Sequence, residues 1–107
     1  MSAANSNKPV IEMTVRLDGR EIVLPGREAF AMDALIQRGE TGVTALEWVG
    51  YRWSGYVFKL RNKGFVIETV HETHGGPFAG RHARYVLHSP VEVVRIVREG
   101  EKTNVAA

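Results

Sequence analysis

The sequence has no cysteine, only four prolines and no long hydrophobic run. Without cysteine the chain forms no disulfide framework, no thiolate metal site and no cysteine nucleophile, and this absence fits a reducing compartment. Its apolar runs are only a few residues long, too short for a membrane-spanning helix, and residues 1–30 lack the apolar stretch of a secretory signal. We therefore expect a cytoplasmic protein that neither enters a membrane nor is exported.

What the sequence does contain is typical of a globular domain. Its 107 residues are 44% hydrophobic and 24% charged, which is enough to build one core without a metal or a crosslink. Residues 1–9 are small and polar and predict a disordered leader, while residues 99–107 predict a flexible tail. A single domain is expected over residues 10–98.

Charge is distributed unevenly, although the net charge is only +2. Residues 1–49 have five Lys or Arg and seven Asp or Glu, whereas residues 50–88 have six cations, two acids and all four histidines. This polarity indicates that the second half presents a face to an anion or to a partner.

The first ordered segment predicts a β-hairpin. Hydrophobic residues alternate from Ile11 to Leu17, the Asp18-Gly19 pair supplies a two-residue turn, and residues 20–24 return. The expected register places Val15 opposite Ile22, Met13 opposite Leu24 and Arg16 opposite Glu21.

Three helices are expected after this hairpin. The first covers residues 27–38 and ends at Gly39, because glycine readily adopts the left-handed conformation that closes a helix. Thr44 and Glu47 have capping-box spacing and predict a short second helix over residues 45–48. The third covers residues 52–63, with an apolar face of Trp53, Tyr56, Val57 and Leu60.

A second hairpin follows the helices. Residues 65–72 are rich in β-branched and aromatic side chains, residues 73–82 form a glycine-rich tip, and residues 83–88 return as a strand. Residues 90–98 fit either a helix, started by Ser89 and Pro90, or a further strand. The sequence leaves both alternatives open.

This order of elements is that of an α+β winged helix-turn-helix: an N-terminal β-hairpin, three helices and a C-terminal β-hairpin wing. In such a fold the third helix enters the major groove of duplex DNA, and the wing contacts phosphates or the minor groove. Placing the apolar face inward leaves the following DNA-contact candidates on the helix: Arg52, Ser54, Lys59, Arg61 and Asn62. The candidates on the wing are Arg81, His82 and Arg84.

Several segments resemble a family of small bacterial winged-helix domain proteins that is common in alphaproteobacteria. The matching segments are VRLDGREIVLPGR at 15–27, GVT at 42–44, RWSGYV at 52–57 with KLR at 59–61, IET at 67–69, and HGGPFAGRHARYVL at 74–87. The resemblance covers about residues 10–92 and implies the winged-helix fold. Members of the family tend to have alanine at the position of Gly55 and a polar residue at that of Phe58.

The sequence therefore predicts a DNA-binding protein without enzymatic activity, cofactor, metal or small-molecule substrate, acting as a transcriptional regulator or a phage-type accessory factor. The main alternative is a winged helix that binds another protein or forms a homodimer, in which Phe58 and the edge of the first hairpin supply contacts. A zinc site of His71, His74 and His82 is disfavoured, because the spacing matches no closed-site pattern. Arg84 is alternatively explained as a structural residue paired with Glu68 across the sheet, and Glu72 is a candidate to neutralise one of the two wing arginines, Arg81 or Arg84.

Overall fold

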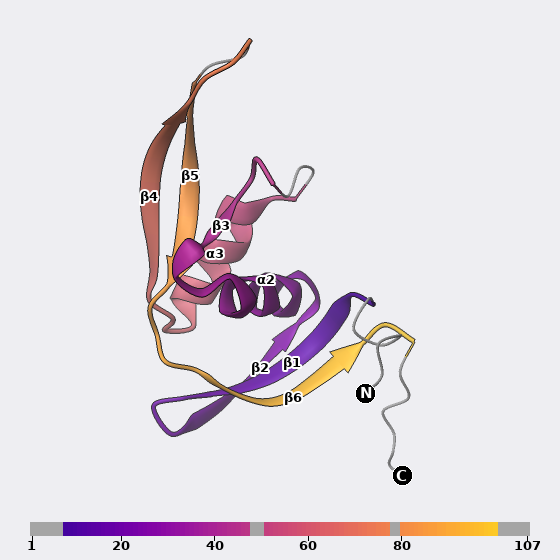
Figure 1. The fold of residues 1–107 in the computed structure, drawn as a ribbon. Coiled ribbons are helices and arrows are strands. Elements are labelled where there is room, and N and C mark those ends of the chain that lie inside the picture. Colours follow the sequence, from indigo (N-terminus) through magenta and orange to yellow (C-terminus); the bar gives the residue numbers. More distant parts are fainter. Residues whose placement is uncertain (1–7, 48–50, 78–79, 101–107) are drawn as a thin grey trace. The chain divides into compact units, whose positions relative to one another are not determined.

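The computed structural model describes residues 8–47, 51–77 and 80–100 (Figure 1). The chain divides into two compact units, one made of residues 1–30 and 90–107 and the other of residues 31–89. We describe each unit by itself, and helix α2 (Gly26–Arg38) contributes residues to both. Most of the expected leader and tail lies outside the described residues. No described helix has the length and hydropathy that crossing a bilayer requires.

The first unit contains a three-stranded antiparallel sheet. Its strands are β1 (Val10–Leu17), β2 (Arg20–Pro25) and β6 (Glu92–Arg98), in the order β2-β1-β6. The register between β1 and β2 is the predicted one, with Met13 opposite Leu24, Val15 opposite Ile22 and Arg16 opposite Glu21. Asp18 and Gly19 both have positive φ, as a tight two-residue hairpin turn requires.

Strand β6 decides the open question about residues 90–98. This segment pairs with β1 on the side opposite β2, so it is a strand and not a helix. Arg16 lies in the central strand and donates to Glu92 at 2.8 Å and to Glu21 at 2.9 Å. The two hydrogen bonds raise the pKa of the Arg16 guanidinium, and the bond to Glu92 has the larger effect. One arginine therefore joins all three strands.

One detail of the predicted hairpin is wrong. Ile11 was expected on the apolar side of β1, but 45% of its surface is exposed, and Val10 is buried instead. The β1–β6 register shifts between Val10 and Glu12, and such an irregularity breaks the alternation of side chains between the two faces.

The second unit contains most of α2, the helix α3 (Trp53–Asn62) and a second antiparallel sheet. Its strands are β3 (Val43–Thr44), β4 (Ile67–His74) and β5 (Gly80–Leu87), in the order β3-β5-β4. Helix α2 ends at Arg38 and is closed, as predicted, by Gly39, which has a φ of 53°. A short 3-10 helix, η1 (Gly39–Thr41), then leads into β3.

The expected second helix is absent, so residues 8–47, 51–77 and 80–100 contain two α-helices and not three. Val43 and Thr44 pair with Tyr85 and Arg84, and residues 45–47 form a turn. Position 48 lies outside the described residues. The Thr44 hydroxyl accepts a hydrogen bond from the Leu46 amide at 3.4 Å, which closes this turn. The capping-box carboxylate of Glu47 instead pairs with Arg38.

The β4–β5 hairpin is longer, and its loop shorter, than the sequence predicted. Pairing continues to His74 and Gly80, so residues expected in the glycine-rich tip belong to the ladder. The reason is that Glu72 lies opposite His82 and their side chains bond, which extends the strands beyond the apolar pattern. Phe78, in the expected tip, lies outside the described residues.

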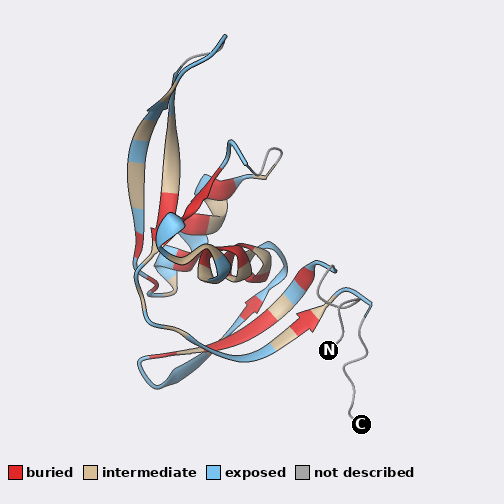
Figure 2. Cartoon of the chain, in the orientation of Figure 1, coloured by how far each residue is buried: buried red, intermediate tan, exposed pale blue. Residues whose placement is uncertain are grey.

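The core of the second unit forms where α3 packs on the inner part of this sheet. Helix α3 buries Trp53, Val57 and Leu60, as predicted from its apolar face, and the inner parts of β4 and β5 bury Ile67, Tyr85 and Val86. The described residues in the outer part of the hairpin, 70–77 and 80–84, are all half-buried or exposed (Figure 2). The hairpin therefore has a packed root and an outer part open to solvent.

Candidate nucleic-acid interface

The face of α3 opposite its buried stripe is exposed and, apart from Phe58, mainly polar. Ser54, Lys59 and Asn62 are exposed on it, and Arg52 is exposed immediately before the helix. Neither Arg52 nor Lys59 forms an ion pair with any acidic side chain in the described part of the chain. Helix geometry produces this arrangement, because the inward positions 53, 57 and 60 leave positions 54, 59 and 62 outside. Two cations and two hydrogen-bonding side chains are thus available to an external ligand.

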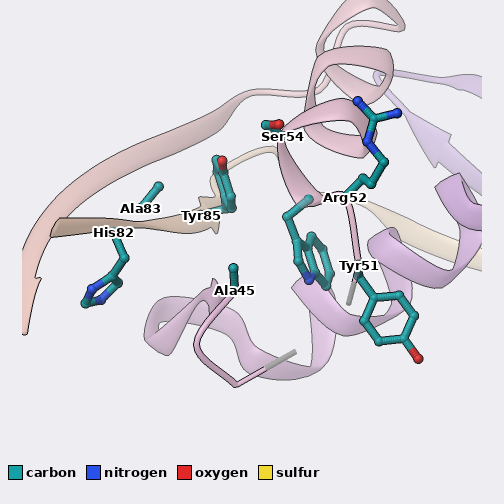
Figure 3. A pocket seen from close by; sticks show the side chains of 8 residues that line it. Ala45, Tyr51, Arg52, Ser54, His82, Ala83 and Tyr85 are labelled. Carbon is teal, nitrogen blue, oxygen red and sulfur yellow. The ribbon is translucent and has the colours of Figure 1, made fainter. Parts of the chain in front are cut away.

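A hollow of about 300 Å³ lies beside the first turn of α3. Trp53, Tyr85 and Ala45 surround it, whereas the Arg52 guanidinium and the Tyr51 ring point away from it (Figure 3). The hollow is therefore walled mainly by carbon, and the nearby cation faces the outer surface.

Arg61, a predicted helix contact, is bonded within the protein. Its Nε donates to the carbonyl oxygen of Ile67 at 3.1 Å, and a terminal nitrogen donates to the Thr69 hydroxyl at 2.8 Å. Both acceptors belong to β4. Arg61 therefore ties the end of α3 to the sheet, and much of its donor capacity is already used.

Arg84 and His82, two of the predicted wing contacts, belong to a hydrogen-bonded chain along the hairpin. Arg84 Nε donates to Glu72 Oε2 at 2.8 Å, and Arg84 Nη1 donates to the carbonyl oxygen of Thr41 at 3.1 Å. Glu72 Oε1 lies 2.9 Å from His82 Nε2, and His82 Nδ1 lies 2.9 Å from His74 Nδ1. Because an ionised carboxylate only accepts, His82 Nε2 is the donor to Glu72.

The contact between Arg84 and Glu72 changes the pKa of both groups. The hydrogen bond from Arg84 lowers the pKa of the Glu72 carboxyl, and the bond from His82 adds to this effect. In return, the same hydrogen bond raises the pKa of Arg84. Glu72 therefore stays ionised and neutralises Arg84. The predicted pair of Arg84 with Glu68 is wrong, because Glu68 instead contacts His88 at 2.7 Å. The prediction that Glu72 neutralises one wing arginine is confirmed, and that arginine is Arg84.

Arg81 differs from its two neighbours on β5. It is exposed, lies opposite Thr73 in the ladder, and forms no ion pair with any acid that the structure describes. Of the three predicted wing contacts, Arg81 is thus the one that does not contact Glu72.

The histidines do not gather into a metal centre. No group of three or more His, Asp or Glu side chains suited to a metal occurs in the described parts of the chain. His74 and His82 are adjacent, but His71 is out of phase with His74 on β4 and points to the other face of the sheet.

Sequence reasoning missed two contacts of residues 41–42 with β5: the Thr41 carbonyl accepts a hydrogen bond from Arg84, and Gly42 closely approaches Tyr85. A Cβ on Gly42 would lie 2.7 Å from the Tyr85 carbonyl oxygen, and this residue has a φ of 78° with ψ near 180°. The Gly42-Val43-Thr44 segment was the available signal, because a glycine before two β-branched residues suits a strand that begins under a close contact.

Comparison with known proteins agrees with this architecture. A family model described as "Winged helix domain" matches residues 21–97, which is more than half of the chain. The chain therefore belongs to the winged-helix domain family. The same comparisons give no match to a curated protein and none to a solved structure.

Proposed function

We propose that this winged-helix domain binds duplex DNA through the outer face of α3, with Arg81 of the β4–β5 hairpin as an additional contact. The observation that carries the proposal is the state of the α3 cations. Arg52 and Lys59 are exposed and have no acidic partner among the described residues, although such partners neutralise Arg16, Arg38 and Arg84. Cations kept available on the helix of a winged domain are suited to phosphates and base edges.

The proposed contacts divide by chemistry. Arg52, Lys59 and Arg81 neutralise phosphates, while Ser54 and Asn62 on α3 hydrogen-bond to base edges or backbone. Three phosphate contacts predict that the logarithm of the binding constant falls against the logarithm of salt concentration with a slope of roughly −3. Steep salt dependence is thus an intrinsic consequence of the proposal.

The other three residues that the sequence placed at the interface receive supporting roles in this proposal. Arg61 holds α3 to β4, and the chain of Arg84, Glu72 and His82 joins β4 and β5 on the face of the hairpin opposite Arg81. Positions held by such contacts present a binding surface in one geometry, which reduces the entropy lost on binding. We place the protein in the cytoplasm, as a regulator of transcription or a phage-type accessory factor.

A double substitution tests the proposal. Arg52→Ala with Lys59→Ala is expected to weaken binding to a random 20-base-pair duplex about tenfold at low salt, measured by fluorescence anisotropy, because two phosphate contacts are lost. The melting temperature should stay unchanged, because neither side chain is paired inside the described protein. Arg61 is left intact because it bonds to β4.

Arg20→Ala with Arg95→Ala is the matched control. It removes the same charge from exposed positions of the first sheet, away from α3 in the sequence. Equal loss of affinity in both double variants would show that only total charge matters, and the assignment of the α3 face would be wrong.

A second candidate function is self-association, and the observation that favours it lies in the first unit. Strand β6 is an edge strand, and its Val93 and Val94 are 39% and 43% exposed. Open edges of this kind can pair with a second copy. Val94→Lys, placed at the β1–β6 register shift, is expected to return a dimer to monomer mass in light scattering; a monomeric wild type would remove this candidate.

A further inference from the structure

Among the described residues, nothing requires a glycine at position 55. Gly55 lies within α3, and it is not among the glycines with positive φ. Beyond its own stretch of helix, a Cβ added to it would meet no described atom within 4 Å, so packing does not require a glycine either. Glycine inside a helix costs about 1 kcal/mol relative to alanine. Because the described residues do not account for this cost, it points to a ligand that approaches the α3 backbone closely at Gly55.

Phe58 lies next to this position on the same side of the helix. Residues three apart in a helix are surface neighbours, and Phe58 is 64% exposed. Because Gly55 has no side chain, one flank of the Phe58 ring is bare. Ser54 and Asn62, each four residues from Phe58, border the ring along the helix with polar groups.

We propose that Phe58 contacts the 5-methyl group of thymine, and that Gly55 allows the α3 backbone to approach the base edges closely enough for this contact. The thymine methyl is the apolar group that base pairs present in the major groove, where apolar side chains recognise it. This inference rests on the proposed function and adds a base preference to it. It makes Phe58 a specificity-determining residue.

Charge around the patch favours DNA over a second copy of the chain. In a two-fold contact centred on Phe58, the same surface of each copy faces the other, so Lys59 and its counterpart come together. Like charges brought together in this way oppose association. DNA phosphates, in contrast, attract both Lys59 and the nearby Arg52.

The test uses one duplex in two chemical forms. The tightest-binding sequence selected from a random 20-base-pair library is prepared with thymidine and with deoxyuridine, which lacks only the methyl group. The wild type is expected to bind the deoxyuridine duplex about five- to tenfold more weakly. Phe58→Ala should bind both forms with equal, reduced affinity. Val66→Ala, which shortens another apolar side chain, 60% exposed and outside α3, should keep the full methyl dependence.

Gly55→Ala provides an independent arm. The alanine should raise the melting temperature, because it favours the helix, and lower the affinity for the thymidine duplex, because its methyl group occupies the space of close approach. A variant with a higher melting temperature and unchanged affinity would overturn the role given to Gly55. Because this variant is expected to be more stable than the wild type, a loss of affinity cannot be attributed to unfolding.

Each failure has a distinct signature. Equal wild-type affinity for both duplexes, or a methyl dependence that persists in Phe58→Ala, overturns this inference and leaves DNA binding intact. A lower solution mass for Phe58→Ala shows that the patch is an interface between copies and also overturns it. Absence of salt-sensitive binding to either duplex rejects the proposed function itself.

Discussion

The contact of residues 41–42 with strand β5 and the outer face of α3 involve the same residue types in opposite circumstances. At the contact with β5, Gly42 has a conformation and a neighbour that only glycine fits, and Arg84 is neutralised by Glu72 and held by the Thr41 carbonyl. On α3, Gly55 has no contact that excludes a side chain, and Lys59 has no acidic partner among the described residues. The comparison separates residues that serve the fold from those available to a ligand.

The largest expected effect contrasts the two glycines. Gly42→Ala should lower the free energy of unfolding by about 3 kcal/mol, because the added Cβ meets the Tyr85 carbonyl and φ is positive. Gly55→Ala should instead raise it by about 1 kcal/mol. Urea denaturation of both variants measures the difference. Similar destabilisation by the two substitutions would contradict the contrast.

The next effect contrasts two cations of α3. Arg61→Ala should destabilise the protein by about 1 kcal/mol, because bonds to Ile67 and Thr69 are lost. Lys59→Ala should change stability by less than about 0.5 kcal/mol, as is usual for an exposed side chain without specific contacts. The two thermal unfolding curves, recorded at one salt concentration, give the comparison directly, and coincident curves would remove the structural role of Arg61.

The smallest effect is a pH dependence at the hairpin. The pKa of Glu72 is lowered in the folded protein, so its contribution to stability is complete above its ordinary value of 4.5 and is lost as pH falls through the lowered value. Glu72→Gln should therefore flatten the fall in melting temperature below about pH 4.5. Glu40→Gln, an exposed change in η1, is the matched control. Parallel pH profiles for wild type and Glu72→Gln would show that the Arg84 contact has no energetic role.

Sequence patterns predicted the elements whose determinants are local. The β1–β2 register follows from the Asp18-Gly19 turn and strand alternation, and the end of α2 follows from Gly39. Sequence patterns failed where residues distant in the chain determine which element forms. Thr44 and Glu47 have the spacing of a helix cap, yet pairing with β5 makes Val43–Thr44 a strand.

The candidate site was predicted in the same uneven way. The exposed and buried faces of α3 follow from helical periodicity, so the exposure of Ser54, Lys59 and Asn62 was accessible from sequence. The sequence did not show which arginine is neutralised. That depends on the cross-strand register, which brings Glu72 to Arg84 and His82. Side-chain type alone did not distinguish Arg81 from Arg84.

The most direct test of DNA binding is the salt dependence of the wild-type protein's affinity for a 20-base-pair duplex, measured by fluorescence anisotropy from about 50 to 200 mM salt. Neutralisation of three phosphates by Arg52, Lys59 and Arg81 predicts a log-log slope of roughly −3. A slope near zero, or no binding at the lowest salt concentration, would contradict the assignment of the α3 face to DNA.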